Sequence, residues 1–266
     1  MHCGAVRLPA IGCGAVPAQL CGPDVNFGHT GILFLSTLAS QALADDPVDE
    51  IEVIGQTPLG AGIEIDQIAS NVQSATADTI REQRALDIAD FMKRNFASVF
   101  VNEAQSNPFQ PDIQYRGFVG SPLLGLPQGI AVYQDGVRVN EPFGDTVNWA
   151  LIPESAIATL YLMPGSNPMF GLNALGGAIV IQTKDGFKNS GTRANIHAGS
   201  FGRVGIQAET GGSTSERFSY FLTGEYLQED GWRDHSPSEV TQLFGNLGWH
   251  MAATTIDVNV TLVATD

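Results

Sequence analysis

The sequence predicts an α+β domain followed by antiparallel strands of a transmembrane β-barrel, and three observations lead to this fold class. Residues 70–184 combine a helical spacing with short apolar runs separated by glycine, proline and asparagine, a pattern typical of a small α+β domain. Beyond Lys184, long segments alternate between apolar and polar side chains. The first 44 residues contain an apolar stretch that is typical of an export signal.

The N-terminal segment, residues 1–44, is expected to be a signal peptide. An apolar core at residues 32–38 precedes small residues that end at Ala44, which matches a hydrophobic region and a cleavage site. The alternative is a short buried helix, because the apolar run is too short to span a bilayer. All three cysteines lie here, at positions 3, 13 and 21, so we expect neither a disulfide nor a reactive thiol in the mature chain.

Residues 45–69 are predicted to form a flexible arm with one strand-forming patch. The arm opens with acidic residues and ends in glycine and proline, and its patch consists of Glu50, Ile51, Glu52, Val53 and Ile54. An extended segment of this kind can add a strand to the sheet edge of a partner, because backbone hydrogen bonds supply the affinity. A plain edge strand or a tail without structure is the alternative interpretation.

The compact domain is expected to span residues 70–186. It opens with a short strand, and a helical spacing follows with Asp87 as a candidate N-cap and apolar positions at Leu86, Ile88, Phe91 and Met92. Short apolar runs between turn residues then predict strands within residues 112–117, 129–139, 157–163 and 178–184.

About five strands are predicted in residues 187–266. Within residues 217–227, one side carries Phe218, Tyr220, Leu222 and Tyr226, and the other carries Arg217, Ser219, Thr223 and Glu225. Antiparallel strands of a soluble sandwich alternate in the same way. Charged residues on the polar side and aromatic residues near strand ends favour a membrane barrel, with apolar side chains toward lipid.

The net charge argues against one class of binding partner and favours others. The chain has 28 acidic residues against 13 Lys and Arg residues, which gives a formal charge of −15. Neutralising phosphates requires a basic face, so this balance argues against a general nucleic-acid binder. The balance favours cations or neutral molecules as ligands.

Four segments in order resemble the N-terminal part of a TonB-dependent outer-membrane receptor. Residues 49–55 resemble a TonB box, and residues 113–118 resemble the Ile-Arg-Gly element of the plug domain. Residues 132–139 resemble the Asp-Gly hairpin of the plug, and residues 169–184 resemble its closing signature with paired glycines. The resemblance covers about residues 48–266 and implies a plug, residues 70–186, lodged in a barrel that begins after it.

The resemblance implies specific roles for residues in these segments. Arg116 is expected to lock the plug to a carboxylate of the barrel, whereas Met163 stands where the family usually has a second arginine. The loop that follows Arg116 offers three candidates for contact with the ligand, Leu123, Leu124 and Leu126. The alternative is that these three leucines pack on the barrel wall. Turn and packing positions of the plug are expected at Gly117, Asp135, Gly136, Gly171, Gly176 and Gly177.

The resemblance also implies partners and a compartment, which is the outer membrane of a Gram-negative cell with the arm in the periplasm. The expected partners are TonB with its inner-membrane energising complex, an extracellular ligand that is most often a ferric siderophore, and outer-membrane lipid. Plugged barrels have about 22 strands, and five strands leave open edges, so we expect this sequence to be a fragment of a longer receptor.

Nothing in the sequence predicts an enzyme. No serine, histidine and aspartate set and no carboxylate pair has motif support, and the five histidines lack the spacing of metal ligands. We therefore expect no cofactor and no metal. Two other functions remain open: an outer-membrane adhesin or structural barrel that never engages TonB, and a secreted β-sandwich binding protein.

Overall fold

The computed structural model describes residues 53–54, 63–64, 70–103, 107–165, 170–231, 233, 235–251 and 254–265. The predicted signal peptide and the arm residues Glu50, Ile51 and Glu52 lie outside these residues. The described residues belong to one compact unit, residues 49–266. Its first elements are a pair of short antiparallel strands, β1 (Val53–Ile54) and β2 (Ile63–Glu64).

A mixed five-stranded sheet forms the centre of the α+β domain, with the strand order β3-β9-β10-β7-β8. Strands β9 and β10 pair antiparallel, whereas β10 and β7 run parallel, so the chain must cross over between β7 and β10. The strands of this sheet are β3 (Gln73–Thr76), β7 (Ile130–Gln134), β8 (Val137–Arg138), β9 (Ile157–Pro164) and β10 (Gly177–Thr183).

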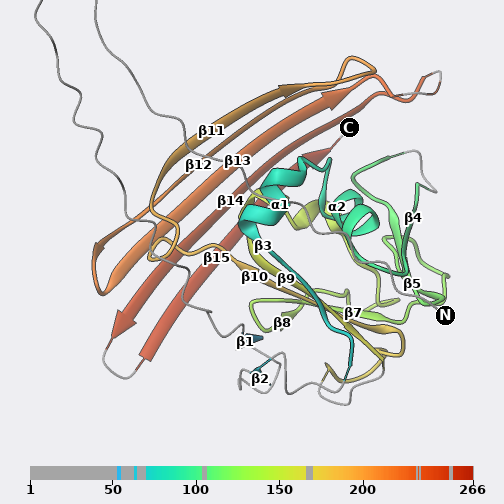
Figure 1. Cartoon of the computed structure of the whole chain (residues 1–266), viewed down its shortest axis with the longest axis horizontal. Coiled ribbons are helices and arrows are strands. Elements are labelled where there is room, and N and C mark those ends of the chain that lie inside the picture. The colour runs from blue at the N-terminus through green and yellow to red at the C-terminus, as the bar shows by residue number, and fades with distance from the viewer. Residues whose placement is uncertain are drawn as a thin grey trace, which may run out of the picture. The chain divides into compact units, whose positions relative to one another are not determined.

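A second, three-stranded sheet completes the domain together with short helices (Figure 1). Its strands are β4 (Val99–Asn102), β5 (Asp112–Tyr115) and β6 (Phe118–Gly120). The helices are α1 (Ala77–Gln83), α2 (Ile88–Asn95) and the 3₁₀ turns η2 (Trp149–Leu151) and η3 (Glu154–Ala156).

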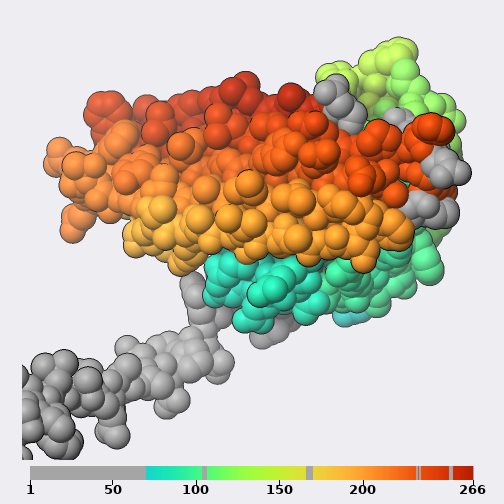
Figure 2. Space-filling view, turned by 90° about the horizontal axis from the view of Figure 1, so that it is seen from above, coloured from blue at the N-terminus to red at the C-terminus, as the bar shows by residue number. Residues whose placement is uncertain are grey.

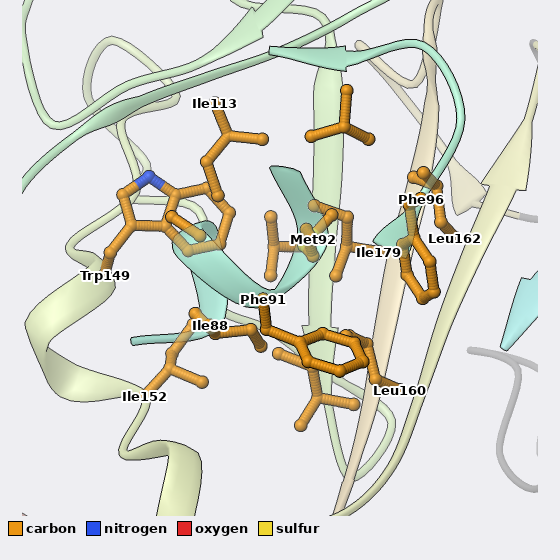
Figure 3. Packing of buried hydrophobic residues seen from close by; sticks show 14 of the residues in the cluster. Ile88, Phe91, Met92, Phe96, Ile113, Trp149, Ile152, Leu160, Leu162 and Ile179 are labelled. Atoms are coloured by element: carbon orange, nitrogen blue, oxygen red, sulfur yellow. The ribbon is translucent and has the colours of Figure 1, made fainter. Parts of the chain in front are cut away.

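Helix α2 begins where the sequence predicts, because the side chain of Asp87 accepts a hydrogen bond from the backbone N–H of Asp90 at 2.7 Å. Its apolar face, including Phe91 and Met92, packs into one buried cluster with residues of β9 and β10 (Figure 3). Helix α1, which precedes α2, was not predicted from the sequence. Arg84 adopts a left-handed backbone conformation, with φ at 46°, and ends α1 before Leu86.

The C-terminal half is an antiparallel sheet of five strands paired in sequence order, as expected (Figure 1). Two of its connections are short, at residues 216–217 and 252–253, and the connection at residues 230–237 is longer. The strands are β11 (Gly191–Ala198), β12 (Val204–Ser215), β13 (Phe218–Glu229), β14 (Ser238–Met251) and β15 (Thr254–Thr265).

The two faces of this sheet differ in polarity and in exposure, and the predicted alternation is confirmed. Figure 2 shows the sheet in orange to red over part of the α+β domain. Its outer face exposes a broad set of apolar side chains: Ile196, Val204, Ile206, Phe218, Tyr220, Leu222, Leu243, Leu247, Trp249, Met251, Ile256, Val258, Val260 and Leu262. Buried polar residues of the inner face include Glu209, Ser219, Thr223, Glu229, Ser238 and Asn246.

The inner face also carries buried apolar residues, because the α+β domain packs against it. Phe221 and Phe244 form a cluster with Ala156 of η3. Leu227 and Val240 form another with Phe109. None of the described helices is long and apolar enough to cross a membrane.

Candidate functional site

Only the backbone of the arm patch is described, at Val53 and Ile54. These two residues pair antiparallel with Glu64 and Ile63, so this part of the arm is extended. An extended backbone is the conformation that strand addition to a partner requires.

The Arg116–Gly117 pair forms the tight turn between β5 and β6, with φ at 51° and 87°. Both values lie in the left-handed region, which Gly117 occupies without a steric cost. The guanidinium carbon of Arg116 lies 5.2 Å from the ring centroid of Tyr115, within the range of a cation–π contact. Among the described residues, Arg116 has no carboxylate partner, so its role as a lock stays a prediction.

Met163, at the position where the resemblance expects a second arginine, is buried in an apolar cluster. It packs with Tyr133, Tyr161 and Phe170. An ion pair at this position is therefore replaced by apolar packing within the domain.

Asp135 and Gly136 form the two-residue turn between β7 and β8, with φ at 48° and 80°. Two positive φ values at a hairpin turn are the reason for an Asp-Gly pair. The carboxylate of Asp135 accepts hydrogen bonds from the backbone N–H and the hydroxyl of Thr183, at 2.8 and 2.7 Å, and from the amide of Asn259 at 2.7 Å. Burial raises the pKa of Asp135 above its ordinary value.

The contact of Asp135 with Asn259 joins the α+β domain to β15. The amide of Asn246 on β14 in turn donates to Asn259 at 2.6 Å. The sequence predicts Asp135 only as a turn residue, because no local pattern reveals a partner 124 positions away.

The absence of side chains at Gly176 and Gly177 has a steric reason. A Cβ atom at Gly176 would lie 2.6 Å from Cβ of Phe118, and one at Gly177 would collide with the backbone oxygen of Met163. The chain can therefore enter β10 at this point only without side chains. Gly171 has φ at 71°, in the left-handed region.

Three loops gather next to one another, and they include the predicted ligand-contact leucines. Leu124 and Leu126 are 59% and 37% exposed, whereas Leu123 is half-buried. Leu124 also lies so close to Gly144 that a Cβ atom there would collide with it. The sequence analysis missed two side chains of the neighbouring loops, Phe143 and Leu172, which are 78% and 86% exposed.

A charged pair holds two of these loops in place. Arg138 donates to both carboxylate oxygens of Asp145, at 2.7 and 3.0 Å, and to the backbone oxygen of Leu172 at 2.8 Å. Asn173 also donates to Asp145. Both contacts to the carboxylate come from the Nη2 atom of Arg138, and hydrogen bonds between charged groups are stronger than those between neutral groups. We name the surface formed by Leu124, Leu126, Phe143 and Leu172 the loop surface.

A buried ion pair joins the end of the α+β domain to the neighbouring sheet. The ammonium of Lys184 lies 2.7 Å from the carboxylate of Glu209 on β12, and both side chains are less than 10% exposed. Arg193 on β11 completes the set with a 2.9 Å contact to the other oxygen of Glu209. Lys184 also lies 5.6 Å from the ring centroid of Phe221. The resemblance implies a lock at Arg116, whereas the ion pair found between the domain and the sheet is formed by Lys184.

Further contacts place the domain against the inner face of the sheet. The amide of Gln242 on β14 donates to the backbone oxygen of Ala150 at 2.6 Å. The ring of Phe187 stacks on His250, with a centroid distance of 4.4 Å. Among the described residues, no group of histidine, cysteine or acidic side chains has the geometry to hold a metal ion.

Comparisons with known proteins agree with this arrangement. Residues 64–178 match the model of the TonB-dependent receptor plug domain. A comparison with curated protein sequences finds no match.

Three solved receptors illustrate the structural similarity. The ferric preacinetobactin receptor BauA of Acinetobacter baumannii has 17% identity and a TM-score of 0.61, over 79% of this chain and 30% of the receptor. The alcaligin outer-membrane receptor FauA of Bordetella pertussis has 16% identity and a TM-score of 0.63, over 80% and 35%. The ferric-catecholate import receptor Fiu of Escherichia coli K12 has 16% identity and a TM-score of 0.60, over 79% and 30%.

The fold is therefore that of a plug domain followed by antiparallel strands of a receptor barrel, and the sheet does not close. Residues 64–178 match the plug-domain family of TonB-dependent receptors, and the fold of the described residues corresponds to the N-terminal portion of the fold of such receptors. It spans about a third of the length of each of these solved receptors. At identities of 14–20%, the solved structures bear on the fold alone.

Proposed function

We propose that the chain is part of a TonB-dependent outer-membrane receptor that takes up a scarce nutrient with energy from the inner membrane. The observation that carries the proposal is the plug domain, seated by the buried Lys184–Glu209 pair against strands whose other face is apolar and exposed. Such a face suits lipid, because barrel strands direct apolar residues outward. The domain boundaries we propose are a leader, residues 1–44, an arm, 45–69, a plug, 70–186, and barrel strands from 187 onward.

In this function the plug closes the barrel, and the arm transmits force. The patch from Glu50 to Ile54 adds a strand to TonB, and the extended backbone at Val53–Ile54 supports this mode of docking. The loop surface receives the ligand, because its apolar side chains are exposed on loops that Arg138 and Asp145 hold in place. Arg116 reaches a carboxylate of the barrel in the full-length protein.

Ferric siderophore is the cargo we propose. The three receptors above are named for ferric preacinetobactin, alcaligin and ferric catecholate, and a further solved structure of this fold is named a siderophore receptor, PirA of Pseudomonas aeruginosa. The family is one of receptors, so we propose no enzymatic activity.

Two measurements on the full-length receptor in outer-membrane preparations and cells test this function. The first is crosslinking: a cysteine at Val53 is expected to form a disulfide with a cysteine on TonB. The second is uptake of iron supplied as a catecholate or hydroxamate siderophore. Val53→Pro is expected to abolish this uptake, because proline disrupts strand pairing. Ala61→Pro, in the arm but outside the patch, is the matched control and should keep uptake.

The outcomes separate the candidate functions. A barrel in the outer membrane without crosslinking to TonB indicates an adhesin or structural barrel. A protein recovered in soluble form indicates a secreted binding protein. Uptake that survives Val53→Pro contradicts docking through the arm patch.

A further inference from the structure

A small cavity lies between the plug and strands β13 and β14. Its volume is about 10 Å³, which is room for about one water molecule. Three carboxyl groups line it: Asp87 and Glu154 from the plug, and Glu225 from β13. The rest of the lining is apolar or amide, and includes Leu86, Phe109 and Gln242. No basic side chain lines the cavity.

One oxygen of the Glu154 carboxyl has no compensating hydrogen bond among the described residues. This oxygen, Oε2, is buried. The nearby amide of Gln242 already donates to the backbone oxygen of Ala150. Burying a carboxylate without a donor costs far more free energy than burying a protonated carboxyl at the same place.

The charges around Glu154 also favour its neutral form. The groups that face it are Glu225 on β13, Asp87 and Asp90 at the start of α2, and Lys184 after β10. Only Lys184 is positive, and its ammonium is committed to Glu209. Asp87 in turn faces Asp90 and Glu103, and accepts the N–H of Asp90 as an N-cap.

We propose that Asp87, Glu154 and Glu225 form a proton-linked contact between plug and barrel: protons held on these carboxyls keep the plug seated, and their release to water loosens it. Ionisation would set acidic groups of the plug against an acidic group of the barrel across a cavity that holds no cation-bearing side chain. The inference goes beyond the proposed uptake, because it concerns the seating of the plug and does not require TonB.

The pKa shifts of the plug carboxyls Asp87 and Glu154 agree with this geometry. Burial, followed by smaller effects that include the charge of Asp90, raises the pKa of Asp87 to about 7. Burial and then the charge of Glu225 raise the pKa of Glu154 well above its ordinary value. The seated state therefore binds more protons than the released state above pH 4, and the stability of the seated plug falls as the pH rises toward 7 and beyond.

The test uses the mature full-length receptor in detergent, without the leader that carries Cys3, Cys13 and Cys21, and with the substitution Ala131→Cys as a reporter. Ala131 is fully buried in β7, so the rate of thiol labelling reports opening of the plug. The rates are divided by those of an unfolded peptide, which removes the ionisation of the thiol itself. We expect the corrected rate to rise about tenfold or more between pH 5 and pH 8, because one unit of pKa shift corresponds to a tenfold change.

Three variants decide between the interpretations. Glu154→Gln and Glu225→Gln should each flatten the pH profile and slow labelling at pH 8, since an amide cannot ionise. Glu82→Gln, an exposed glutamate on α1, is the matched control and should keep the wild-type profile.

Asp87→Asn, which retains the cap, provides a further variant should either glutamine substitution reduce the yield of folded protein. A wild-type profile without pH dependence overturns the proposal. An effect of Glu154→Gln without one of Glu225→Gln also overturns it, because the titration would then be internal to the plug.

Discussion

The contact between Lys184 and Glu209 leads to the sharpest prediction for the seating of the plug. Lys184→Met removes the buried cation and leaves Glu209 with Arg193 alone, whose side chain is 55% exposed. Removing one partner of a buried ion pair costs about 3–5 kcal/mol. We expect a loss of about 3 kcal/mol, at the low end, because Arg193 still compensates part of the carboxylate charge.

A double-mutant cycle distinguishes the interaction energy of this pair from a general loss of stability. Glu209→Gln alone should also cost about 3 kcal/mol, because it leaves the Lys184 ammonium buried at 7% exposure. The double variant should cost about 2 kcal/mol less than the sum of the two single variants, as expected of residues in direct contact. The assay is the labelling rate of Ala131→Cys in the full-length receptor, in which 2 kcal/mol corresponds to about 30-fold in the opening equilibrium.

The exposed Lys188 provides the matched control. Lys188→Met should change the labelling rate by less than about 2-fold, since surface substitutions of this kind have small effects. Strictly additive effects of Lys184→Met and Glu209→Gln would refute the reasoning, because the two side chains would then stabilise the plug independently of each other.

Three further predictions concern the turn, the glycine pair and the loop surface. Asp135→Ala should cost about 2 kcal/mol of plug stability in the same assay, because it leaves the N–H of Thr183 and the amide of Asn259 without an acceptor; an unchanged stability contradicts this. Gly176→Val should cost at least about 1–3 kcal/mol through overpacking, and normal thermal stability would disprove it. Phe143→Asp should weaken cargo binding, measured by titration, without changing plug stability, since Phe143 is 78% exposed.

The alternation in the C-terminal half could be predicted because it is a local property of each strand. A period of two assigns Tyr220 and Leu222 to one face and Ser219 and Thr223 to the other, and the structure has them there. The cap at Asp87 was equally local, since it joins two residues that are three positions apart.

The contacts that seat the plug could not be predicted, because they join residues that are distant in the sequence. The sequence predicts Lys184 as the last residue of an apolar strand, and its partner Glu209 lies on another strand, 25 positions away. No spacing rule connects them. The same holds for Glu154 and Glu225, whose proximity arises only when the plug packs on β13.

The end of α1 could not be predicted for a local reason. A glycine or asparagine usually marks a left-handed helix end, and here the residue is Arg84. The exposed Phe143 was missed because a single aromatic residue in a loop gives no periodic signal.

The central claim is that β13 separates lipid from a seated plug. Spin labels placed one at a time along residues 218–228 of the full-length receptor, in outer-membrane vesicles, test it most directly. We expect accessibility to oxygen, which is enriched in lipid, to alternate with a period of two and peak at Tyr220 and Leu222, while Ser219 and Thr223 remain protected from both oxygen and a water-soluble relaxant. Uniform access to the water-soluble relaxant at all these positions would contradict the account.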